Sequence, residues 1–567
     1  MASTRSAAGD TSVPVPDATT GDGEPAAHRL LDSLLSAAES RRPRTEAVDR
    51  PVTDTAAGGD TAAGGDTAAG GDTVAGVGKP ASRDGEADRS SPLQDFLQAR
   101  QVGDALDRWL GQGWRDDPRY ATADDVGRRL SADIAEIDRM LDGQVNAILH
   151  HPRFQKLEAS WRGLAYLVRR VDLEGDPMVQ IRVLTVSWAE LETDFDRAVE
   201  FDQSQLFKKV YEDEFGTPGG EPFGILIGDY DVRPRPSRTH RQDDVGVLRS
   251  LAGVAAAAFC PFLCAASPDL LDLESFAELQ VTRDHATRLA AKDYLKWNAL
   301  RDHEDSRFLG CLLPRVMMRA PYGDGGGRRD GFVFREDVSR PDGQDYLWGS
   351  PAYAYASVLI RSFAMSGWLA DIRGLRRDED GGGLVSDLPA LSFPTDATGV
   401  IPRPVTEVAI TDALERQLSD LGLLPLCDCK DTPMGVFASG QSLQRPKKYD
   451  RPDVTANAKI SAMLPYILTV SRFAHYVKII ARSKIGSFSS AEDLERILHD
   501  WVMDYVTADR EASTDVKSRK PLREASIRVQ PDPAKPGSYY CIMRLAPHYE
   551  LDEMVGSVRL QTRLAGV

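Results

Sequence analysis

The feature that most constrains this chain is a long apolar run near its C-terminal end, LPYILTVSRFAHYVKIIARSKIGSF, residues 464–488. A membrane-spanning helix needs about 20 consecutive apolar residues. Here four basic residues interrupt the run at spacings of 3, 3 and 4, which is the repeat of one helix face: Arg472, His475, Lys478 and Arg482. The run therefore predicts a mostly buried helix with a cationic face, and no membrane insertion.

Composition limits the class of protein further. A second apolar run, Leu251 to Ala266, is 16 residues long and contains Pro261, so it predicts buried core rather than a membrane span. A chain of 567 residues with 42% hydrophobic and 27% charged residues is typical of a globular protein of several domains. A formal net charge of −17 argues against nucleic acid as a partner. The start lacks an apolar secretion signal, so we expect a cytoplasmic protein whose six cysteines are reduced.

Residues 1–90 differ in composition from the rest. The hexapeptide DTAAGG occurs three times in succession between Asp54 and Gly71, and none of its side chains can bury enough apolar surface to offset backbone entropy. We expect a disordered, low-complexity extension. Within it, residues 28–42 predict a short amphipathic helix, whose leucines share one face: Leu30, Leu31, Leu34 and Leu35. Such a helix between flexible flanks usually docks on a partner, although an incidental helix remains an alternative.

The remaining chain predicts a mixed α/β fold of several domains. Residues 91–170 read as a helical N-terminal region, in which apolar residues from Val126 to Ile148 recur every three or four positions after the cap sequence TADD. Residues 171–404 read as an α/β core with loop insertions, including strands at 178–187 and 222–232. Short strands and glycine-rich loops are expected from Arg301 to about Pro404. Residues 405–567 read as a helical block to Asp509 followed by terminal strands.

The candidate sites for chemistry are weak. Ser442 lies in GQSLQ, but Gln444 replaces the second glycine of a nucleophile elbow. The cluster RDHEDSR, 301–307, fits a helix end tied by ion pairs better than a metal site. Cys427 and Cys429 lack a second ligand pair at metal-site spacing. The loop GDGGGRRDG has no phosphate-binding pattern. We therefore expect no catalytic, cofactor-binding or metal-binding residues and no enzymatic activity.

Several long stretches of the sequence resemble the large subunit of the type VI secretion contractile sheath, the TssC or VipB type. They include IAEIDRMLDGQVNAILHHPRFQKLEASWRGLAYLV, GILIGDYDV, WNALRDHEDSRFLGCLLPRVMMRAPYG, LWGSPAYAYASVLIRSFAMSGWLADIRG, QSLQRPKKYDRPDVTANAKISAMLPYILTVSRFAHYVKIIARSKIGSF and PGSYYCIMRLAPHYELDEM. They run in order from about residue 95 to 565. Two alternatives remain: a sheath protein of a related contractile injection machine or phage tail, and, more distantly, a cytoplasmic serine hydrolase using Ser442 with His475 or His548.

The resemblance implies a structural protein with a contractile-sheath subunit fold. Such subunits pair with a small sheath subunit of the TssB or VipA type, here expected through residues 91–170. They polymerise with further copies of themselves around an inner tube of the Hcp type, starting from a baseplate. The contracted cylinder is recycled by an AAA+ unfoldase of the ClpV type. Because energy is stored as a difference between two packings of the same subunits, no nucleotide site is needed in this chain.

Two further surfaces are candidate interfaces. The cationic face of Arg472, His475, Lys478 and Arg482 could meet the inner tube, or could pair with carboxylates of the same chain. Near the C-terminus, Val558, Leu560 and Leu564 alternate with polar residues, which predicts a strand with one buried face. The resemblance implies that such a strand is donated to a neighbouring subunit. The alternative, which is compatible with donation, is pairing with the nearby segment SYYCIMRL.

Overall fold

The computed structural model describes residues 92–171, 179–217, 219–238, 240–281, 284–323, 332–340, 343–376, 381–390, 404–430, 432–484, 490–509, 511–531, 533, 539–548 and 558–564. The chain divides into two compact units, Met1–Trp109 and Leu110–Val567. In the first unit, the described residues form α2 (Pro92–Leu97) and most of α3 (Val102–Leu110), with the rings of Phe96 and Trp109 5.2 Å apart. The predicted leucine helix and the DTAAGG repeats lie outside the described residues.

The second unit opens with two consecutive helices, α4 (Ala123–Leu149) and α5 (Pro152–Arg170). The predicted cap is confirmed, since the Thr122 side chain accepts from the backbone N–H of Asp125 and the Asp125 side chain accepts from that of Thr122. Pro152 begins α5, a position where its missing N–H costs nothing. The long helix predicted from apolar spacing is thus confirmed, but none of its side chains is buried.

The centre of the second unit is a parallel four-stranded sheet of order β1-β2-β3-β7. Its strands are Leu226–Val232, Phe262–Ala266, Leu309–Leu313 and Leu424–Pro425. Parallel neighbours need a crossover connection, and α8 (Asp244–Ala258) lies between β1 and β2 in the chain. The apolar run predicted as core forms the second half of α8 and all of β2, and this prediction is confirmed.

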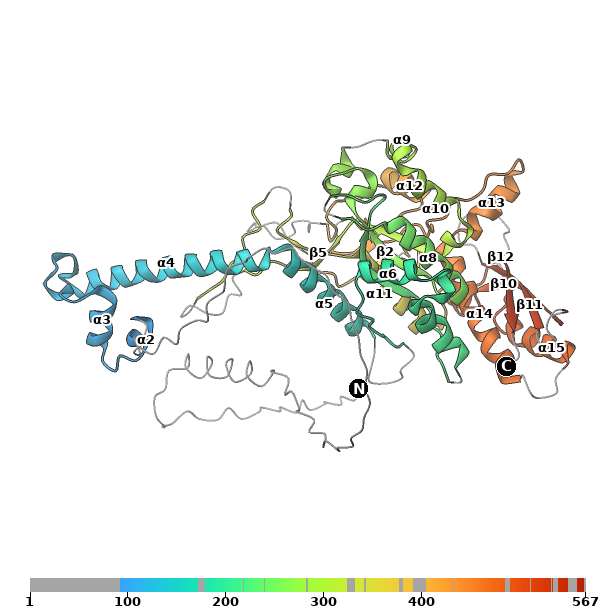
Figure 1. Cartoon of the computed structure of the whole chain (residues 1–567), viewed down its shortest axis with the longest axis horizontal. Coiled ribbons are helices and arrows are strands. Elements are labelled where there is room, and N and C mark those ends of the chain that lie inside the picture. The colour runs from blue at the N-terminus through green and yellow to red at the C-terminus, as the bar shows by residue number, and fades with distance from the viewer. Residues whose placement is uncertain are drawn as a thin grey trace, which may run out of the picture. The chain divides into compact units, whose positions relative to one another are not determined.

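Further helices and small sheets belong to this unit, and β10, β11, α14 and α15 lie together at one side of it (Figure 1). The helices are α6 (Trp188–Arg197), α7 (Gln205–Phe207), α9 (His285–Leu289), α10 (Leu295–Asp302), α11 (Pro351–Ser366), α12 (Asp412–Asp420), α13 (Pro452–Ser461), α14 (Leu464–Lys484), α15 (Ala491–Met503), α16 (Thr514–Arg519) and the π-helix η4 (Lys208–Gly216). Short 3-10 helices complete the list: η1 (Trp114–Asp116) and η2 (Pro118–Tyr120) before α4, and then η3 (Phe201–Gln203), η5 (Pro268–Leu271), η6 (Phe276–Gln280), η7 (Lys292–Tyr294) and η8 (Glu304–Phe308). The additional sheets are β4-β5 (Val316–Arg319, Leu347–Gly349), β6-β9-β8 (Leu384–Val385, Gly435–Val436, Cys427–Asp428) and β10-β11-β12 (Leu522–Pro531, Tyr539–Pro547, Val558–Leu564).

The interior consists of three apolar clusters. The first surrounds α8 and one face of the parallel sheet, and the second packs α11 against the opposite face, where Leu263, Leu312 and Leu424 lie. The third joins α14 and α15 to β10 and β11, and it includes Phe473, which is fully buried. The helix predicted from the opening apolar run is therefore confirmed as α14. No helix among the described residues is long and apolar enough to cross a membrane.

The mixed α/β class is confirmed, whereas three local predictions are wrong. The segment predicted as a strand at 178–187 forms no strand over its described residues, 179–187. The region from Arg301 to Pro404 contains the buried helix α11, which was not predicted because an almost uniformly apolar helix shows no amphipathic period. The block from 405 to 509 is not purely helical, because β7, β8 and β9 interrupt it.

Gly163 tests how tightly α5 packs on α11. A Cβ built at Gly163 would lie 2.4 Å from a ring carbon of Tyr353, which is a clash, whereas one at Gly143 on α4 would have nothing within 4 Å. We predict that Gly163→Ala destabilises the fold by about 1–3 kcal/mol through overpacking, and that Gly143→Ala is neutral or stabilising by up to about 1 kcal/mol. Thermal unfolding followed by circular dichroism measures both. Equal melting temperatures for the two variants would contradict the close approach.

Candidate functional site

The outward side of α5 carries apolar side chains that nothing in the described chain covers. Phe154, Leu157 and Trp161 follow at spacings of 3 and 4, so they share one helix face, and they are 37%, 56% and 65% exposed. The opposite side, with Ala159, Gly163 and Leu167, is buried. A helix that is apolar on both sides usually packs between two surfaces. For α5, the described chain supplies one of these surfaces.

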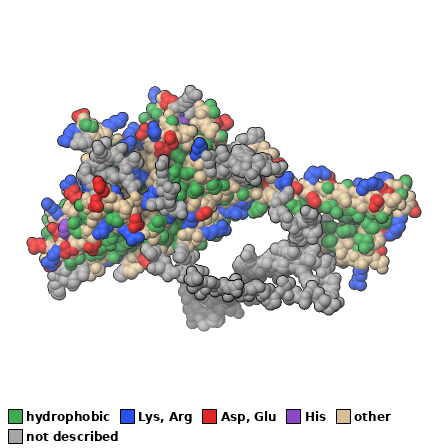
Figure 2. Space-filling view, turned by 180° about the vertical axis from the view of Figure 1, so that it is seen from behind, with side chains coloured by type: hydrophobic (Ala, Val, Ile, Leu, Met, Phe, Trp, Pro, Cys, Tyr) green, Lys and Arg blue, Asp and Glu red, His purple; other side chains and the backbone are tan. Residues whose placement is uncertain are grey.

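The same is true of α4. Ile134, Leu141 and Ile148 recur every seven residues and are 57%, 43% and 50% exposed, and hydrophobic side chains are visible along α4 (Figure 2). A helix of 27 residues draws most of its stability from packing of its apolar face. Together, these side chains of α4 and α5 form what we call the arm face: Ile134, Leu141, Ile148, Phe154, Leu157 and Trp161.

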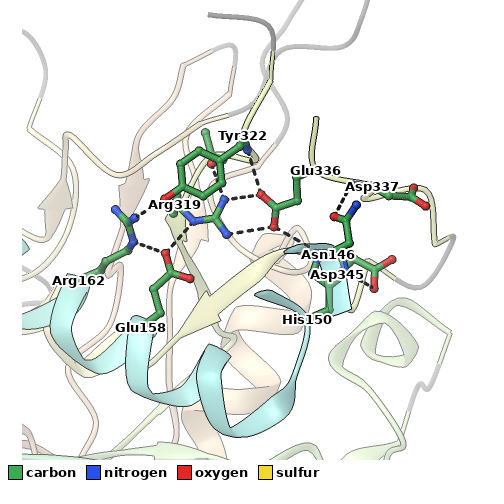
Figure 3. A network of polar contacts seen from close by, with 10 residues as sticks. Asn146, His150, Glu158, Arg162, Arg319, Tyr322, Glu336, Asp337 and Asp345 are labelled. Carbon is green, nitrogen blue, oxygen red and sulfur yellow. Dashed lines mark hydrogen bonds and ion pairs between the residues drawn. The ribbon is translucent and has the colours of Figure 1, made fainter. Parts of the chain in front are cut away.

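A buried polar network lies where the two helices meet the core (Figure 3). At its centre is Arg319 at the end of β4, whose Nη2 donates to Glu336 Oε1 at 3.0 Å and whose Nε donates to Glu158 Oε1 at 2.9 Å. Burial acts to lower the pKa of Arg319, but the hydrogen bonds to the two carboxylates outweigh it and hold that pKa above its ordinary value. Burial acts to raise the pKa of Glu336, but Arg319 and the backbone N–H of Tyr322 hold it below its ordinary value. The charges therefore stay paired.

The network reaches both helices of the arm face. His150 Nε2, at the end of α4, lies 3.3 Å from Glu336 Oε1, and the Asn146 side chain accepts from the backbone N–H of Asp337 at 3.0 Å. On α5, Arg162 donates to Glu158 at 2.7 Å. Removing one partner of a buried ion pair leaves an uncompensated charge, at a cost of about 3–5 kcal/mol. The network thus fixes the end of α4 and the middle of α5 against β4 and residues 332–340.

The sequence analysis did not identify this network. The sequence does contain one sign of the network, which is a charged residue, Arg319, directly after the apolar Val316–Met318. An arginine that ends a buried strand needs a partner for its charge. The identity of that partner depends on contacts across 161 and 17 residues of sequence, to Glu158 and Glu336. These long-range contacts cannot be predicted from the spacing of residues in the sequence.

The cationic face of α14 lies against other parts of the same chain. The guanidinium carbon of Arg472 lies 5.3 Å from the ring centroid of Phe363, and Lys478 Nζ lies 4.0 Å from that of Phe215. Lys478 also donates to the Tyr211 hydroxyl at 2.8 Å, and Arg482 donates to the carbonyl of Thr217 at 3.4 Å. Within the described residues, the contacts of this face are aromatic rings, tyrosine hydroxyls and backbone carbonyls. A contact with an inner tube stays a prediction.

His475 is the most enclosed member of this face, at 1% exposure. Its Nε2 lies 3.0 Å from the carbonyl of Ala258, so this nitrogen carries the proton and donates. Burial lowers the pKa of His475 to about 4, and the charges of Arg472 and Lys478 add to the effect. Burial also lowers the pKa of Lys478 to about 8. The imidazole is therefore neutral and structural at neutral pH.

Within the described chain, the other candidate residues from the sequence do not come together in a catalytic or metal-binding arrangement. Ser442 is fully buried, and its hydroxyl accepts from the backbone N–H of Gln444 at 3.3 Å. Arg301 is buried and donates to the carbonyls of Leu443 and Asp420. Cys427, on β8, is a free thiol, as is Cys429. The part of the chain that the structure describes brings together no group of three or more histidine, cysteine or carboxylate side chains around a possible metal ion.

The predicted terminal strand is confirmed as β12, and it pairs antiparallel with β11 of the same chain. Val558 lies opposite Leu545, Leu560 opposite Met543 and Leu564 opposite Tyr539. Intrachain pairing, which the sequence analysis held as an alternative, is thus present. Donation of the strand to a neighbour stays a prediction. Leu30, Leu31, Leu34 and Leu35 lie outside the described residues.

The depressed pKa of His475 predicts a pH effect on stability. Since the unfolded imidazole titrates near 6.5 and the folded one near 4, protonation favours unfolding, and stability falls as pH drops from 6.5 toward 4. Between pH 7 and pH 5 we expect a loss of about 2 kcal/mol from this group. His475→Gln should remove that part of the loss, whereas the same change at the half-buried His499 should not. Urea unfolding of both variants at the two pH values measures it, and an unchanged pH dependence in His475→Gln would contradict the assignment.

Comparisons with known proteins agree with the resemblance seen in the sequence. The family model for the EvpB/VC_A0108 tail sheath N-terminal domain matches residues 131–444, and that for the EvpB/VC_A0108 tail sheath gpW/gp25-like domain matches residues 453–564. The chain is 41% identical to the type VI secretion system sheath protein TssC1 of Pseudomonas aeruginosa over 479 residues, which are 83% of this chain and 94% of that protein. The sheath tail protein of Desulfitobacterium hafniense, a solved structure, is 12% identical, with coverage of 56% of this chain and 60% of that chain and a TM-score of 0.26. The chain belongs to the VipB family of tail sheath proteins and is a sheath large subunit of the TssC type from a type VI secretion system.

Proposed function

We propose that this chain assembles with a small sheath subunit into a helical cylinder around an inner tube, and that contraction of the cylinder propels the tube. The observation that carries the proposal is the exposed arm face, on helices held rigid by the buried network around Arg319. An apolar surface that includes an exposed tryptophan is a surface for a protein partner. Family membership indicates what kind of partner this is.

The small sheath subunit is the proposed occupant of the arm face. Residues 91–170, the region assigned to this contact in the sequence, contain all six side chains of that face. Interface energy is concentrated in buried aromatic anchors, and Trp161, at 65% exposure, is the strongest anchor available there. The complex would cover α4 on the side that the chain itself leaves open.

Further copies of the chain form the polymer in this proposal. A helical assembly requires heterologous contacts, in which different surfaces of neighbouring copies meet. A strand near a chain end can supply such a contact by adding to the sheet of a neighbour, and β12 is the candidate. The inner tube, the baseplate and an AAA+ recycling unfoldase are the remaining proposed partners. The work is supplied by the difference between two packings, so the role is structural rather than enzymatic.

Substitution of Trp161 tests whether the arm face binds the small sheath subunit. We predict that Trp161→Asp weakens binding of the small subunit at least about tenfold, since a central aromatic anchor contributes about 2 kcal/mol or more. Arg169→Asp, at an exposed position later on the same helix, should bind almost normally. Co-expression with the tagged small subunit from the same gene cluster, followed by pull-down and circular dichroism, measures both. Equal recovery of the two variants would show that the arm face is not the contact.

The wild-type chain provides the decisive test of the function. We expect poor solubility when it is expressed alone, because the arm face is uncovered, and soluble heterodimers and tubes on co-expression. Negative-stain electron microscopy distinguishes tubes from discrete particles. A stable, monodisperse monomer at high concentration, with no tubes on co-expression, would refute the proposal.

A separate prediction concerns the terminal strand β12. Deleting residues 556–567 removes β12, while the third apolar cluster keeps its residues on α14, α15, β10 and β11. We expect a folded heterodimer with a circular dichroism spectrum near that of wild type, but no tubes, because the link between copies is lost. Deleting only 565–567 is the control and should leave tubes intact. Tubes of normal length from the longer deletion would show that β12 does not join subunits.

A further inference from the structure

The segment 179–187 has the composition of a strand but no strand partner in the described chain. Its sequence, VQIRVLTVS, is rich in β-branched residues, which favour extended pairing. In the structure it runs without helix, turn or bend. Among the described residues, its backbone groups from Val179 to Val186 make one hydrogen bond, in which the Val186 carbonyl accepts from the Tyr230 hydroxyl at 2.6 Å.

The side chains of the segment are exposed as well. Val183 is 68% exposed, Leu184 52% and Ile181 37%. Because neighbouring residues of an extended chain point to opposite sides, Val183 and Leu184 leave both sides of the segment open. Natural proteins rarely leave such a segment uncovered, since an unpaired row of backbone groups beside apolar side chains is a template for pairing.

The segment is nevertheless held in place. Arg182 donates to Glu214 at 2.5 Å and to Glu221 at 3.1 Å. At the other end, Ser187 caps α6 in a reciprocal pair of hydrogen bonds with Glu190. A segment that is already straight and anchored loses less conformational entropy on pairing than a free loop does.

We propose that residues 180–186 become a strand in the assembled protein, by adding to the edge strand of a β-sheet in the small sheath subunit. This inference rests on the proposed function. In such pairing, main-chain hydrogen bonds provide the affinity, and alternate side chains such as Ile181 and Val183 provide register. The failed strand prediction at this position then has a cause, which is that the partner strand belongs to another chain.

Two observations favour the small subunit over a second copy. Antiparallel pairing of the segment with itself in another copy would be isologous and would close a twofold dimer, which does not grow into a helix. The segment also follows α5 in the sequence, and both have exposed apolar side chains, among them Trp161 and Val168 on α5 and Val183 in the segment. A partner bound to α5 is therefore the nearest candidate along the chain.

Proline variants test the main-chain hydrogen bonds. Successive N–H groups of a strand point to opposite edges, so of Val183→Pro and Leu184→Pro, only the one that removes a paired N–H should weaken binding strongly. We expect at least about tenfold weaker pull-down for one and a small effect for the other. Val183→Thr keeps the N–H and is the matched control, with near-normal binding expected. Equal, near-normal binding of both proline variants would overturn the proposal.

Hydrogen exchange provides a readout that does not depend on variants. In the wild-type heterodimer, alternate amides of 180–186 should exchange at least about 100-fold more slowly than those of the exposed residues Lys447 and Lys448. Fast exchange throughout 180–186 in the heterodimer would overturn the inference while leaving the proposed function intact. Protection that arises only in tubes would assign the contact to a second copy and would also overturn it. Absence of both heterodimer and tubes would instead refute the proposed function, and the inference with it.

Discussion

The buried ion pairs of Arg319 with Glu336 and Glu158 determine how the arm face is oriented on the rest of the molecule. They join β4, α5 and the segment at 332–340, and His150 extends them to the end of α4. An apolar contact at this place would allow the two helices to slide, because hydrophobic attraction has no direction. Charge-assisted hydrogen bonds require specific geometry, so they hold the arm face in one orientation. A surface that is both apolar and fixed in orientation is suited to selecting a single partner.

The basic side chains of α14 make a different kind of contact from those of Arg319. They lie on aromatic rings of η4 and α11 and on the carbonyl of Thr217, all far away in the sequence. Because rings and carbonyls carry no net charge, these contacts are less sensitive to salt than exposed ion pairs are. The helix is therefore part of the interior of the subunit, and it links the central cluster to the C-terminal sheet through His475 and Phe473.

Sequence analysis was most successful where structure is local. The capping box at Thr122, the helix α4 and the strand β12 were predicted from residues a few positions apart, and each is present. It failed where the outcome depends on distant residues. The apolar α11 has no period to detect, and the partners of Arg319 lie in other elements. For the candidate site, the cationic face of α14 was recognised but its ring partners were not, and the segment at 179–187 was read as a strand although no strand of the described chain pairs with it.

The length of α4 has a mechanical consequence. A helix of 27 residues measures about 40 Å at 1.5 Å per residue. Its C-terminal end is clamped by the buried network, and none of the residues along it is buried in the part of the subunit that the structure describes. A rotation of only 10° at the clamp would displace the far end by about 7 Å, given that length. The subunit therefore contains a lever, in which a small change in packing at the core becomes a large movement at a distance.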